Sequence, residues 1–329
     1  MPLAAAAYSN NPQQCLSNIQ YSQYGHQPYY NVGLYRQYSI KCDSLNDTCS
    51  GFTAVDCASN EIIISFKGVT NPKQFYQSWN YTEMIPFVIG GKVNKQIFDA
   101  FNDIWIKSGM RDDVYTLRNK LSDLYRFTVV GHSTGGAMAS LAAATMVSIG
   151  ITTQDNLFLT TYGQPRTGDK DFANAFTNAF DYQYIRLTRV IHNHDIVPHL
   201  PSLNSSGYYH HVTENWYPND MGSNVTFYIC DSYDGEDPQC CDSLLNSTLN
   251  FDDHNIYFGR EFSDYGIKGC PDLGTAGQKS FKNTSFTKNI PNLYKSQNNA
   301  NNAKKRNTRF AKRNGILFAK TPICPDSGF

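Results

Sequence analysis

One short stretch, FTVVGHSTGGAMA at residues 127–139, constrains the fold of this chain more than any other. An apolar, β-branched run leads into Gly-His-Ser-Thr-Gly, and the residues that follow favour a helix. Glycines two positions before and two positions after Ser133 remove the Cβ atoms that would crowd a serine in a sharp turn. A serine there also faces the free N–H groups and the positive dipole end of the helix. The stretch predicts a strand, a tight turn and a helix, with a nucleophilic serine in the turn.

Strands and helices alternate on both sides of this turn. Continuous apolar runs predict strands at 61–67, 127–130, 157–163 and 184–192, and apolar periodicity or a high alanine content predicts helices at 1–10, 95–105, 111–125, 135–150 and 169–180. Buried strands alternating with helices are typical of parallel sheets with right-handed crossovers. We therefore expect an α/β fold, with a mostly parallel central sheet flanked by helices.

The charge distribution divides the chain into two parts. The chain has 28 basic and 28 acidic residues, but from Gln278 onward there are 11 basic residues and one acid, which leaves 17 basic and 27 acidic residues before it. We expect a folded domain over 1–275 and a disordered, basic, low-complexity tail over 276–329. The acidic domain argues against nucleic acid as a partner. The tail is compatible with binding to anionic lipid or polysaccharide, with cleavage at its dibasic sites and with an error in the gene model.

The cysteines indicate an oxidising compartment. There are nine, and no histidine lies at zinc-ligand spacing from the two groups Cys42/Cys49 and Cys230/Cys240/Cys241, so disulfides are favoured over a metal site. We expect a secreted protein without metal or organic cofactor. No window approaches 18 continuous apolar residues, so no transmembrane segment is expected. The first residues lack the features of a signal peptide, which we interpret as prior removal or a gene model that starts late.

A nucleophilic serine needs a base and an acid that orients the base. Asp195 directly follows a predicted strand, at the sheet edge where α/β folds bind ligands. His254 follows in a polar loop, so the order is Ser, acid, His, as in the α/β-hydrolases. His210 and His211 are the alternatives for the base. Their aromatic surroundings and the nearby Glu214 favour a structural role for them, so we expect His254 to be the base.

Five segments in this order resemble the class 3 (fungal-type) triacylglycerol lipases: VVGHSTGGAMASLAAA, TTYGQPRTGDKDFANAF, RVIHNHDIVPHLP, GYYHHVTENWY and DHNIYFG. LAAAAYSNNPQQC and KCDSLNDTCSGFTAVD are most similar to secreted nematode members. The resemblance covers about residues 3–270. It implies the α/β-hydrolase fold, with Ser133 as the nucleophile, Asp195 as the acid and His254 as the base.

The resemblance also implies where the oxyanion of the reaction is stabilised. The family has F-R-G-[ST] after its first core strand, and this chain has F-K-G-V, with Val69 in place of the hydroxyl residue and Lys67 in place of arginine. The Val69 N–H remains available as a donor, with the Thr134 N–H as the second donor. Thr134 itself replaces a common leucine. The lost hydroxyl reduces the expected activity unless Thr70 compensates.

The resemblance implies two further features. Residues 73–91 fall where family members have a lid over the active site, and the alternative is an ordinary loop that packs its aromatic side chains on the core. The implied disulfides are Cys15–Cys270, Cys42–Cys49 and a bond from Cys230 to either Cys240 or Cys241.

The sequence thus predicts a secreted serine ester hydrolase, foremost a triacylglycerol lipase that acts at a lipid–water interface. The triad does not select the acyl group, so a phospholipase or a carboxylesterase for small, non-lipid esters is the alternative enzyme. A weakened hydrolase that serves as a lipid-binding protein is the alternative from another class, because position 69 lacks the hydroxyl.

Overall fold

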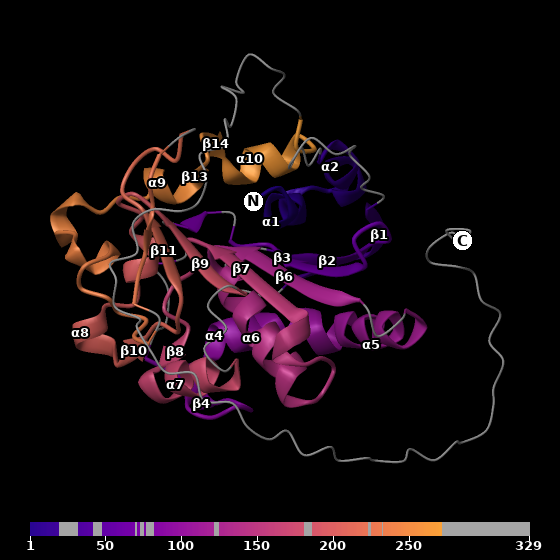
Figure 1. The fold of residues 1–329 in the computed structure, drawn as a ribbon, viewed down its shortest axis with the longest axis horizontal. Helices are drawn as coiled ribbons and strands as arrows, with labels where there is room; N and C mark the ends of the chain where they lie inside the picture. Colours follow the sequence, from indigo (N-terminus) through magenta and orange to yellow (C-terminus); the bar gives the residue numbers. More distant parts are fainter. Residues whose placement is uncertain are drawn as a thin grey trace, which may run out of the picture. The chain divides into compact units, whose positions relative to one another are not determined.

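Among the described residues, eight strands form the central sheet, in the order β1-β2-β3-β6-β7-β9-β11-β12 (Figure 1). Their bounds are Val32–Lys41, Thr48–Asp56, Glu61–Phe66, Arg126–His132, Leu157–Tyr162, Leu187–His192, Glu214–Tyr217 and Tyr228–Ile229. The inner pairs from β3 to β11 are parallel, whereas β1–β2, β2–β3 and β11–β12 are antiparallel. The predicted α/β class with a mostly parallel sheet is confirmed.

The computed structural model describes residues 1–19, 32–41, 48–69, 71–72, 76, 82–121, 125–180, 186–222, 225–231 and 233–271. The expected basic tail at 276–329 lies outside these residues and stays a prediction. Within the described part of the chain, every helix is too short or too polar to cross a bilayer.

Helices cover both faces of the sheet (Figure 1). On one face α6 packs on β3, β6 and β7, with α4 and α7 against α6 and α5 against β2, and on the other face α1 packs on β3, β6 and α10. The helices are α1 Pro2–Ala5, α2 Pro12–Asn18, α4 Lys95–Asn102, α5 Met110–Lys120, α6 Thr134–Ser148, α7 Lys170–Ala179, α8 Leu203–Ser206, α9 Asp252–Asn255 and α10 Phe262–Ile267. The predicted helices near 1–10, 95–105, 111–125, 135–150 and 169–180 are therefore present.

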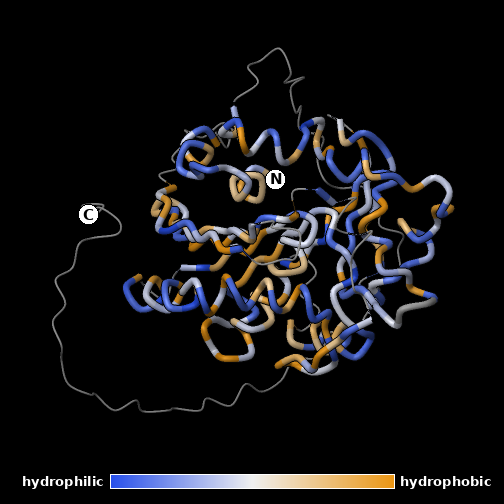
Figure 2. Tube along the Cα trace, turned by 180° about the vertical axis from the view of Figure 1, so that it is seen from behind, coloured by the Kyte–Doolittle hydropathy of each residue, from blue (hydrophilic) through white to orange (hydrophobic). Residues whose placement is uncertain are grey.

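The helix that follows the predicted turn is the central helix of the core. α6 is rich in alanine, and its residues from Thr134 to Ala144 are buried. A helix that is apolar on all sides is stable only when it is surrounded, as α6 is here. Gly150, with φ of +72°, lies just beyond its end. Figure 2 shows hydrophobic residues along the central strands and hydrophilic residues on many outer turns.

Part of the predicted lid segment belongs to a second, smaller sheet with the order β10-β8-β5-β4. Its strands are Tyr208–Tyr209, Gly168–Asp169, Lys92–Asn94 and Met84–Pro86. Phe87, between β4 and β5, packs its ring edge-on against Phe98 and Phe172. This half of the segment is a packed hairpin, as the ordinary-loop interpretation requires. Residues 73–75 and 77–81 lie outside the described part.

The disulfide predictions are largely confirmed. Cys15 is bonded to Cys270, which joins α2 to the residues after α10. Of the two partners left open for Cys230, Cys240 forms the bond and Cys241 is a buried free thiol. Cys49 is disulfide-bonded, but Cys42 lies outside the described residues, so the bond between these two stays a prediction.

Candidate active site

Ser133 occupies the strained corner that its flanking residues predict. β6 ends at His132, α6 begins at Thr134, and Ser133 between them has φ of 59° and ψ of −133°. Positive φ is costly for a residue with a side chain and persists only where the surroundings fix it. Here the Ser133 N–H donates to the carbonyl of Tyr162 at 2.9 Å. The turn thereby presents the serine at the carboxyl end of the parallel strands.

The glycines of the turn are required by close backbone packing. A Cβ at Gly131 would overlap the backbone of Gly135, and a Cβ at Gly135 would overlap the Phe66 carbonyl and lie 2.8 Å from the Gly68 nitrogen. Their role therefore extends beyond clearing space around the serine. They bring the turn against the segment that follows β3, which contains Val69.

Asp195 and His254 form a buried pair. The Nδ1 atom of His254 lies 3.0 Å from Oδ1 and 2.9 Å from Oδ2 of Asp195, and both side chains are fully buried. The Tyr257 hydroxyl and the Val197 N–H also donate to this carboxylate, at 2.7 and 2.9 Å. Because a carboxylate only accepts hydrogen bonds, Nδ1 of His254 carries the proton and Nε2 is left as the acceptor. This is the tautomer that a general base requires.

The structure brings the serine to the same place as this pair. A Cβ at Gly163, which has φ of +54°, would lie 2.6 Å from Asp195 Oδ2 and 2.8 Å from His254 Nδ1. The adjacent residue, Tyr162, accepts the Ser133 N–H. Ser133 Oγ and His254 Nε2 are both buried and form no hydrogen bond with each other. Catalytic hydrogen bonds of this kind often close only when a substrate is bound.

The two predicted oxyanion donors lie next to each other. The Val69 N–H donates to the side-chain oxygen of Thr134 at 3.1 Å. Thr134 is the first residue of α6, and the first amides of a helix have no acceptor within the helix. Val69 and Thr134 thus form a polar corner directly beside the serine.

Tyr76, from the predicted lid segment, interacts with the side chain of Ser133. Its ring stacks on Phe251 with a centroid distance of 6.4 Å. Burial raises the pKa of the Tyr76 hydroxyl, and the hydrogen-bonding side chain of Ser133 partly opposes this increase. Ser133 has no exposed surface, so a substrate reaches it only if groups such as Tyr76 move.

Comparisons with known proteins agree with this geometry. Residues 63–205 match the family model described as Lipase (class 3). A lipase of Caenorhabditis elegans is 28% identical over 298 residues, which cover 82% of this chain and 80% of that protein. A lipase of Rhizomucor miehei is 32% identical over 203 residues, which cover 60% of this chain and 52% of that protein. A solved lipase structure from Rhizopus microsporus var. chinensis, 26% identical, has a TM-score of 0.65 and covers 80% of this chain and 86% of that chain.

The chain is similar to the class 3 lipases and is a lipase-like carboxylic ester hydrolase. The α/β-hydrolase fold predicted from the sequence is confirmed with it.

Three residues that support this lipase-like site were missed from the sequence. Tyr257 holds the acid, Gly163 borders the acid and the base, and Tyr8 lies behind the nucleophilic turn. Tyr257 follows His254 by three positions, in the short strand β13 (Ile256–Tyr257) after α9, and this spacing is the signal that could have identified it. Tyr8, in the Ala-rich first segment, is brought to the site by packing between distant parts of the chain, so nothing in the sequence indicated it.

Tyr8 and His132 connect the oxyanion segment to the base. The Gly68 N–H donates to the Tyr8 hydroxyl at 3.2 Å, this hydroxyl lies 2.8 Å from His132 Nδ1, and His132 Nε2 lies 3.0 Å from the His254 carbonyl oxygen. A carbonyl only accepts, so His132 Nε2 donates to it and Nδ1 accepts from Tyr8. Burial keeps the pKa of His132 well below its usual value, which holds the ring neutral. The side chain of His132 thereby supports the loop that carries His254.

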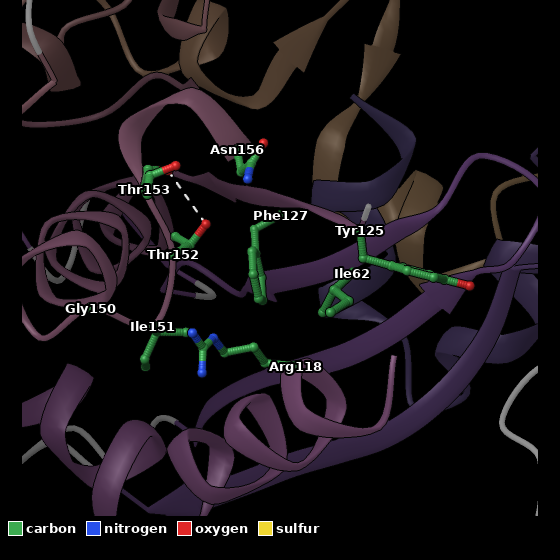
Figure 3. A pocket seen from close by; sticks show the side chains of 9 residues that line it. All are labelled: Ile62, Arg118, Tyr125, Phe127, Gly150, Ile151, Thr152, Thr153 and Asn156. Carbon is green, nitrogen blue, oxygen red and sulfur yellow. Dashed lines mark hydrogen bonds between the residues drawn. The ribbon is translucent and has the colours of Figure 1, made fainter. Parts of the chain in front are cut away.

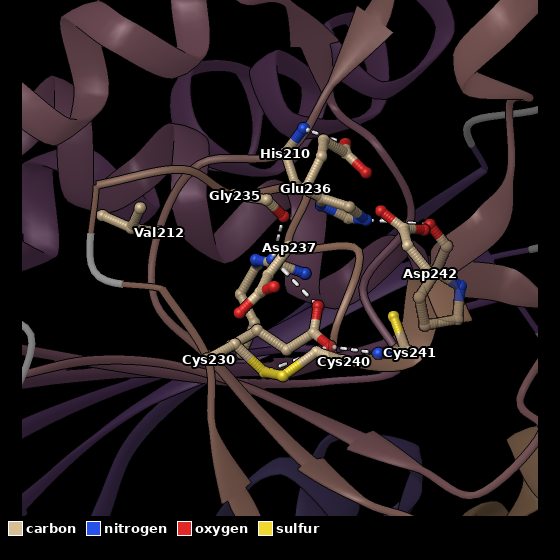
Figure 4. A network of polar contacts seen from close by, with 12 residues as sticks. His210, Val212, Cys230, Gly235, Glu236, Asp237, Cys240, Cys241 and Asp242 are labelled. Carbon is tan, nitrogen blue, oxygen red and sulfur yellow. Dashed lines mark hydrogen bonds and ion pairs between the residues drawn. A yellow bond between two sulfur atoms is a disulfide. The ribbon is translucent and has the colours of Figure 1, made fainter. Parts of the chain in front are cut away.

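His210 and His211, the alternatives for the base, are both buried and hydrogen-bonded to other groups. His210 Nε2 donates to the Pro198 carbonyl at 2.8 Å. The backbone N–H of His210 donates to the Glu236 carboxylate at 2.6 Å (Figure 4). His211 bonds the hydroxyl of Ser140 at 3.0 Å and the Val212 carbonyl at 2.7 Å. Burial lowers the pKa of His211 to about 3. Both rings are therefore neutral, and each is hydrogen-bonded to a neighbouring group.

These histidines belong to a larger buried network around two arginines. Arg166 forms two bonds to Glu236, at 2.8 and 2.6 Å, and one to Asp242 at 3.2 Å. Arg189 bonds Glu214 at 3.3 Å and the carbonyl of His211 at 2.7 Å. Figure 4 shows Glu236 and Asp242 of this network together with the Cys230–Cys240 disulfide. The carboxylate expected beside the histidines, Glu214, is thus paired with an arginine.

Two groups of side chains have metal-ligand spacing among the described residues. One contains Glu214 and the sulfurs of Cys230 and Cys240, which are joined in a disulfide. The other contains His199, Cys241 and Asp242. Its carboxylate is already bonded to Arg166, and burial and nearby carboxylates keep the pKa of the Cys241 thiol well above its usual value. Neither group offers the thiolates or free carboxylates that a tight metal site needs.

A pocket at the opposite end of the sheet is separate from the serine site. It is lined by residues at the beginning of β3, β6 and β7, including Ile62, Phe127 and Asn156, and by Arg118 and Tyr125 (Figure 3). Ligands of parallel α/β sheets bind at the carboxyl ends of the strands. This pocket lies at their amino ends, so we assign it no part in the reaction.

Proposed function

We propose that this protein is a secreted serine ester hydrolase that cleaves triacylglycerols. The observation that carries the proposal is the buried Asp195–His254 pair, at 2.9 and 3.0 Å, beside a serine on a strained turn. Serine alone is a weak nucleophile, and a base held by a buried carboxylate is what activates it.

The reaction follows from the positions of these atoms. As Ser133 Oγ forms its bond to the ester carbonyl carbon, its proton passes to Nε2 of His254, and the π electrons move to the carbonyl oxygen. N–H groups of Val69 and Thr134 donate to this oxyanion. Collapse breaks the bond to the alcohol oxygen, which takes the proton from His254. Water then attacks the acyl-enzyme in the same way and releases the fatty acid and the free serine. Asp195 holds the imidazole orientation throughout.

A lipid substrate is supported by the relatives, which are named lipases. Extracellular action is supported by the disulfides Cys15–Cys270 and Cys230–Cys240, because such bonds persist in oxidising compartments. The complete burial of Ser133, with Tyr76 interacting with its side chain, supports action at an interface, where an apolar surface would replace the contacts that bury the serine.

The test is replacement of the nucleophile. We expect Ser133→Ala to lower the turnover of a soluble p-nitrophenyl ester by about 10⁶-fold with the fold unchanged. Ser263→Ala, at an exposed hydroxyl far along the chain, is the matched control and should retain full activity. A fluorophosphonate probe should label the parent protein and not the Ser133 variant. Retained turnover in the Ser133 variant would remove this serine from the mechanism.

A second assay identifies the class of ester that the protein cleaves. We expect the rate on an emulsified triacylglycerol to rise sharply as the substrate passes its solubility limit. A higher rate on phospholipid vesicles, or on small esters without such a rise, would instead identify a phospholipase or a carboxylesterase. A parent protein that binds lipid but is not labelled by the probe would identify a weakened hydrolase that acts as a lipid-binding protein.

A further inference from the structure

Two departures from the family sequence meet in the structure. The family's hydroxyl residue after the first core strand is Val69 here, and the apolar residue after the nucleophile is Thr134. The Val69 N–H donates to the Thr134 hydroxyl oxygen at 3.1 Å. The hydroxyl missing from one side of the oxyanion site is therefore present on the other side.

The position of this hydroxyl matches that of the oxyanion. An oxyanion hole works by aiming fixed N–H donors at the point where negative charge develops. In the resting structure the acceptor that faces the Val69 N–H is the Thr134 oxygen. That oxygen thus lies where, or close to where, the oxyanion must lie to accept the same N–H. Thr134 is 6% exposed, so water competes little for its hydroxyl.

The hydroxyl is also chemically able to donate. A hydroxyl that accepts one hydrogen bond keeps its own proton for another. Threonine has few side-chain rotamers, and the Cα of Thr134 is fixed at the start of α6, next to the strained serine. Rotation about the Cα–Cβ bond moves the oxygen away from the position of the oxyanion and exchanges its accepting role for a donating one.

We propose that the hydroxyl of Thr134 is a third donor of the oxyanion hole, in addition to the two N–H groups, an inference that rests on the proposed function. When Ser133 attacks, the Val69 N–H passes from the Thr134 oxygen to the oxyanion, and the Thr134 O–H turns to donate to it. The hydroxyl keeps its proton, and the proton of Ser133 still passes to His254. The hydroxyl stabilises the intermediate by hydrogen bonding alone.

Two other roles of the Thr134 hydroxyl would give different results on substitution. If the Thr134 hydroxyl only blocked the Val69 N–H, its removal would free that donor and raise the turnover. If it only positioned the Val69 segment, a hydroxyl placed elsewhere in the hole could not replace it. Substitution at the two positions therefore separates a donor from a blocking or a positioning group.

The experiment moves the hydroxyl from one side of the hole to the other. Thr134→Val removes the hydroxyl and preserves the shape of the side chain. We expect kcat for a soluble ester to fall by about 10²-fold with little change in KM, since the donor acts on the transition state. Adding Val69→Thr to that variant restores a hydroxyl at the family position, and we expect kcat to recover to within about tenfold of the parent.

A buried threonine on another helix provides the control. Thr177 lies in α7, and its hydroxyl donates to the Ala173 carbonyl at 3.0 Å. Thr177→Val makes the same chemical change away from the serine and should leave kcat unaltered. Thermal unfolding of each variant verifies that it is folded before its rates are compared.

The outcomes separate this inference from the proposed function. A parent protein that hydrolyses esters and a Ser133→Ala variant that does not would support the proposed function whatever Thr134 does. With that result, a Thr134→Val kcat at or above the parent value would overturn the inference, and so would a loss that Val69→Thr fails to recover. A parent protein without any hydrolysis would overturn both.

Discussion

The turn around Ser133 and the network around Arg166 lie in the same domain but are stabilised in opposite ways. The turn depends on missing side chains, because a Cβ at Gly131 or Gly135 would overlap neighbouring backbone. The network depends on charged side chains, with Arg166 and Glu236 each 3% exposed and bonded to each other. Substitutions in the turn should therefore alter the reaction, and substitutions in the network should alter folding.

The largest effect on stability is expected in the network. Arg166→Met leaves the buried Glu236 carboxylate without its cation, and loss of one partner of a buried pair costs about 3–5 kcal/mol in the free energy of unfolding. Urea unfolding measures this loss, and kcat per folded molecule should stay at the parent value.

A second substitution tests the cause of that loss. Adding Glu236→Gln to Arg166→Met removes the unpaired charge and keeps an oxygen that can accept the His210 N–H. This double variant should be more stable than Arg166→Met alone. A fall in kcat per folded molecule that follows the fall in stability would contradict this expectation and would show that the network affects the active site.

The next largest effect is in the turn. A Cβ in Gly135→Ala meets the backbone of Phe66 and Gly68 and displaces the segment that carries Val69. A displacement of about 1 Å in a catalytic group can lower kcat by about 10²-fold, and we expect a fall of that size for a soluble ester.

Gly222 is the matched control, because a Cβ there has nothing within 4 Å. Gly222→Ala should leave both kcat and stability close to the parent values. Parent activity in Gly135→Ala would mean that the close approach of the two segments is not needed for the reaction.

The smallest effect concerns pH. Burial lowers the pKa of His211 from 6.5 to about 3 and that of His210 well below 6.5. Above the pKa of these histidines in the unfolded chain, both rings are neutral in the folded and in the unfolded state, and the full stability is present. Below it only the unfolded chain binds these protons, so the free energy of unfolding falls as pH falls, by about 1.4 kcal/mol per unit for each histidine. Urea unfolding between about pH 6 and pH 4 measures this slope.

His211→Gln isolates the contribution of one ring, since glutamine can still bond Ser140. The slope of its unfolding free energy against pH should correspond to the uptake of about one proton fewer on unfolding than in the parent. An unchanged slope would show that His211 is protonated in the folded protein, against its burial between Phe176 and the backbone.

The strongly patterned part of the fold was predictable from the sequence. Continuous apolar runs such as Ile62–Ile64 can be stable only inside a sheet covered on both faces, so β3, β6, β7 and β9 were predicted correctly. The antiparallel β1 and β2 were missed. β1 alternates buried and exposed residues irregularly and contains a register shift after Leu34, so it lacks a clear period. The short strands β4, β5, β8 and β10 form only because tertiary contacts bring them together.

In the candidate site, too, local patterns were readable from the sequence and long-range contacts were not. Ser133 could be proposed as the nucleophile because local rules of turns and helix termini act within five residues, and Asp195 could be proposed as the acid because a strand end fixes its place. The contacts of Tyr8 with His132 and Gly68 span 124 and 60 residues. No local pattern encodes such pairs. The hydrogen bond from Val69 to Thr134 likewise depends on two segments 65 residues apart, and the sequence revealed only that each residue was unusual.

The disulfide between Cys15 and Cys270, 255 positions apart, has a consequence for how the site is assembled. It joins the segment that follows Tyr8 to the residues that follow the base loop, so the two ends of the domain are covalently linked next to the site. Closing so long a loop is worth about 5 kcal/mol in the chain-entropy account. A reducing environment would consequently loosen the support of Gly68 and His254 together, and oxidation of one remote thiol pair would be a condition for a competent catalytic centre.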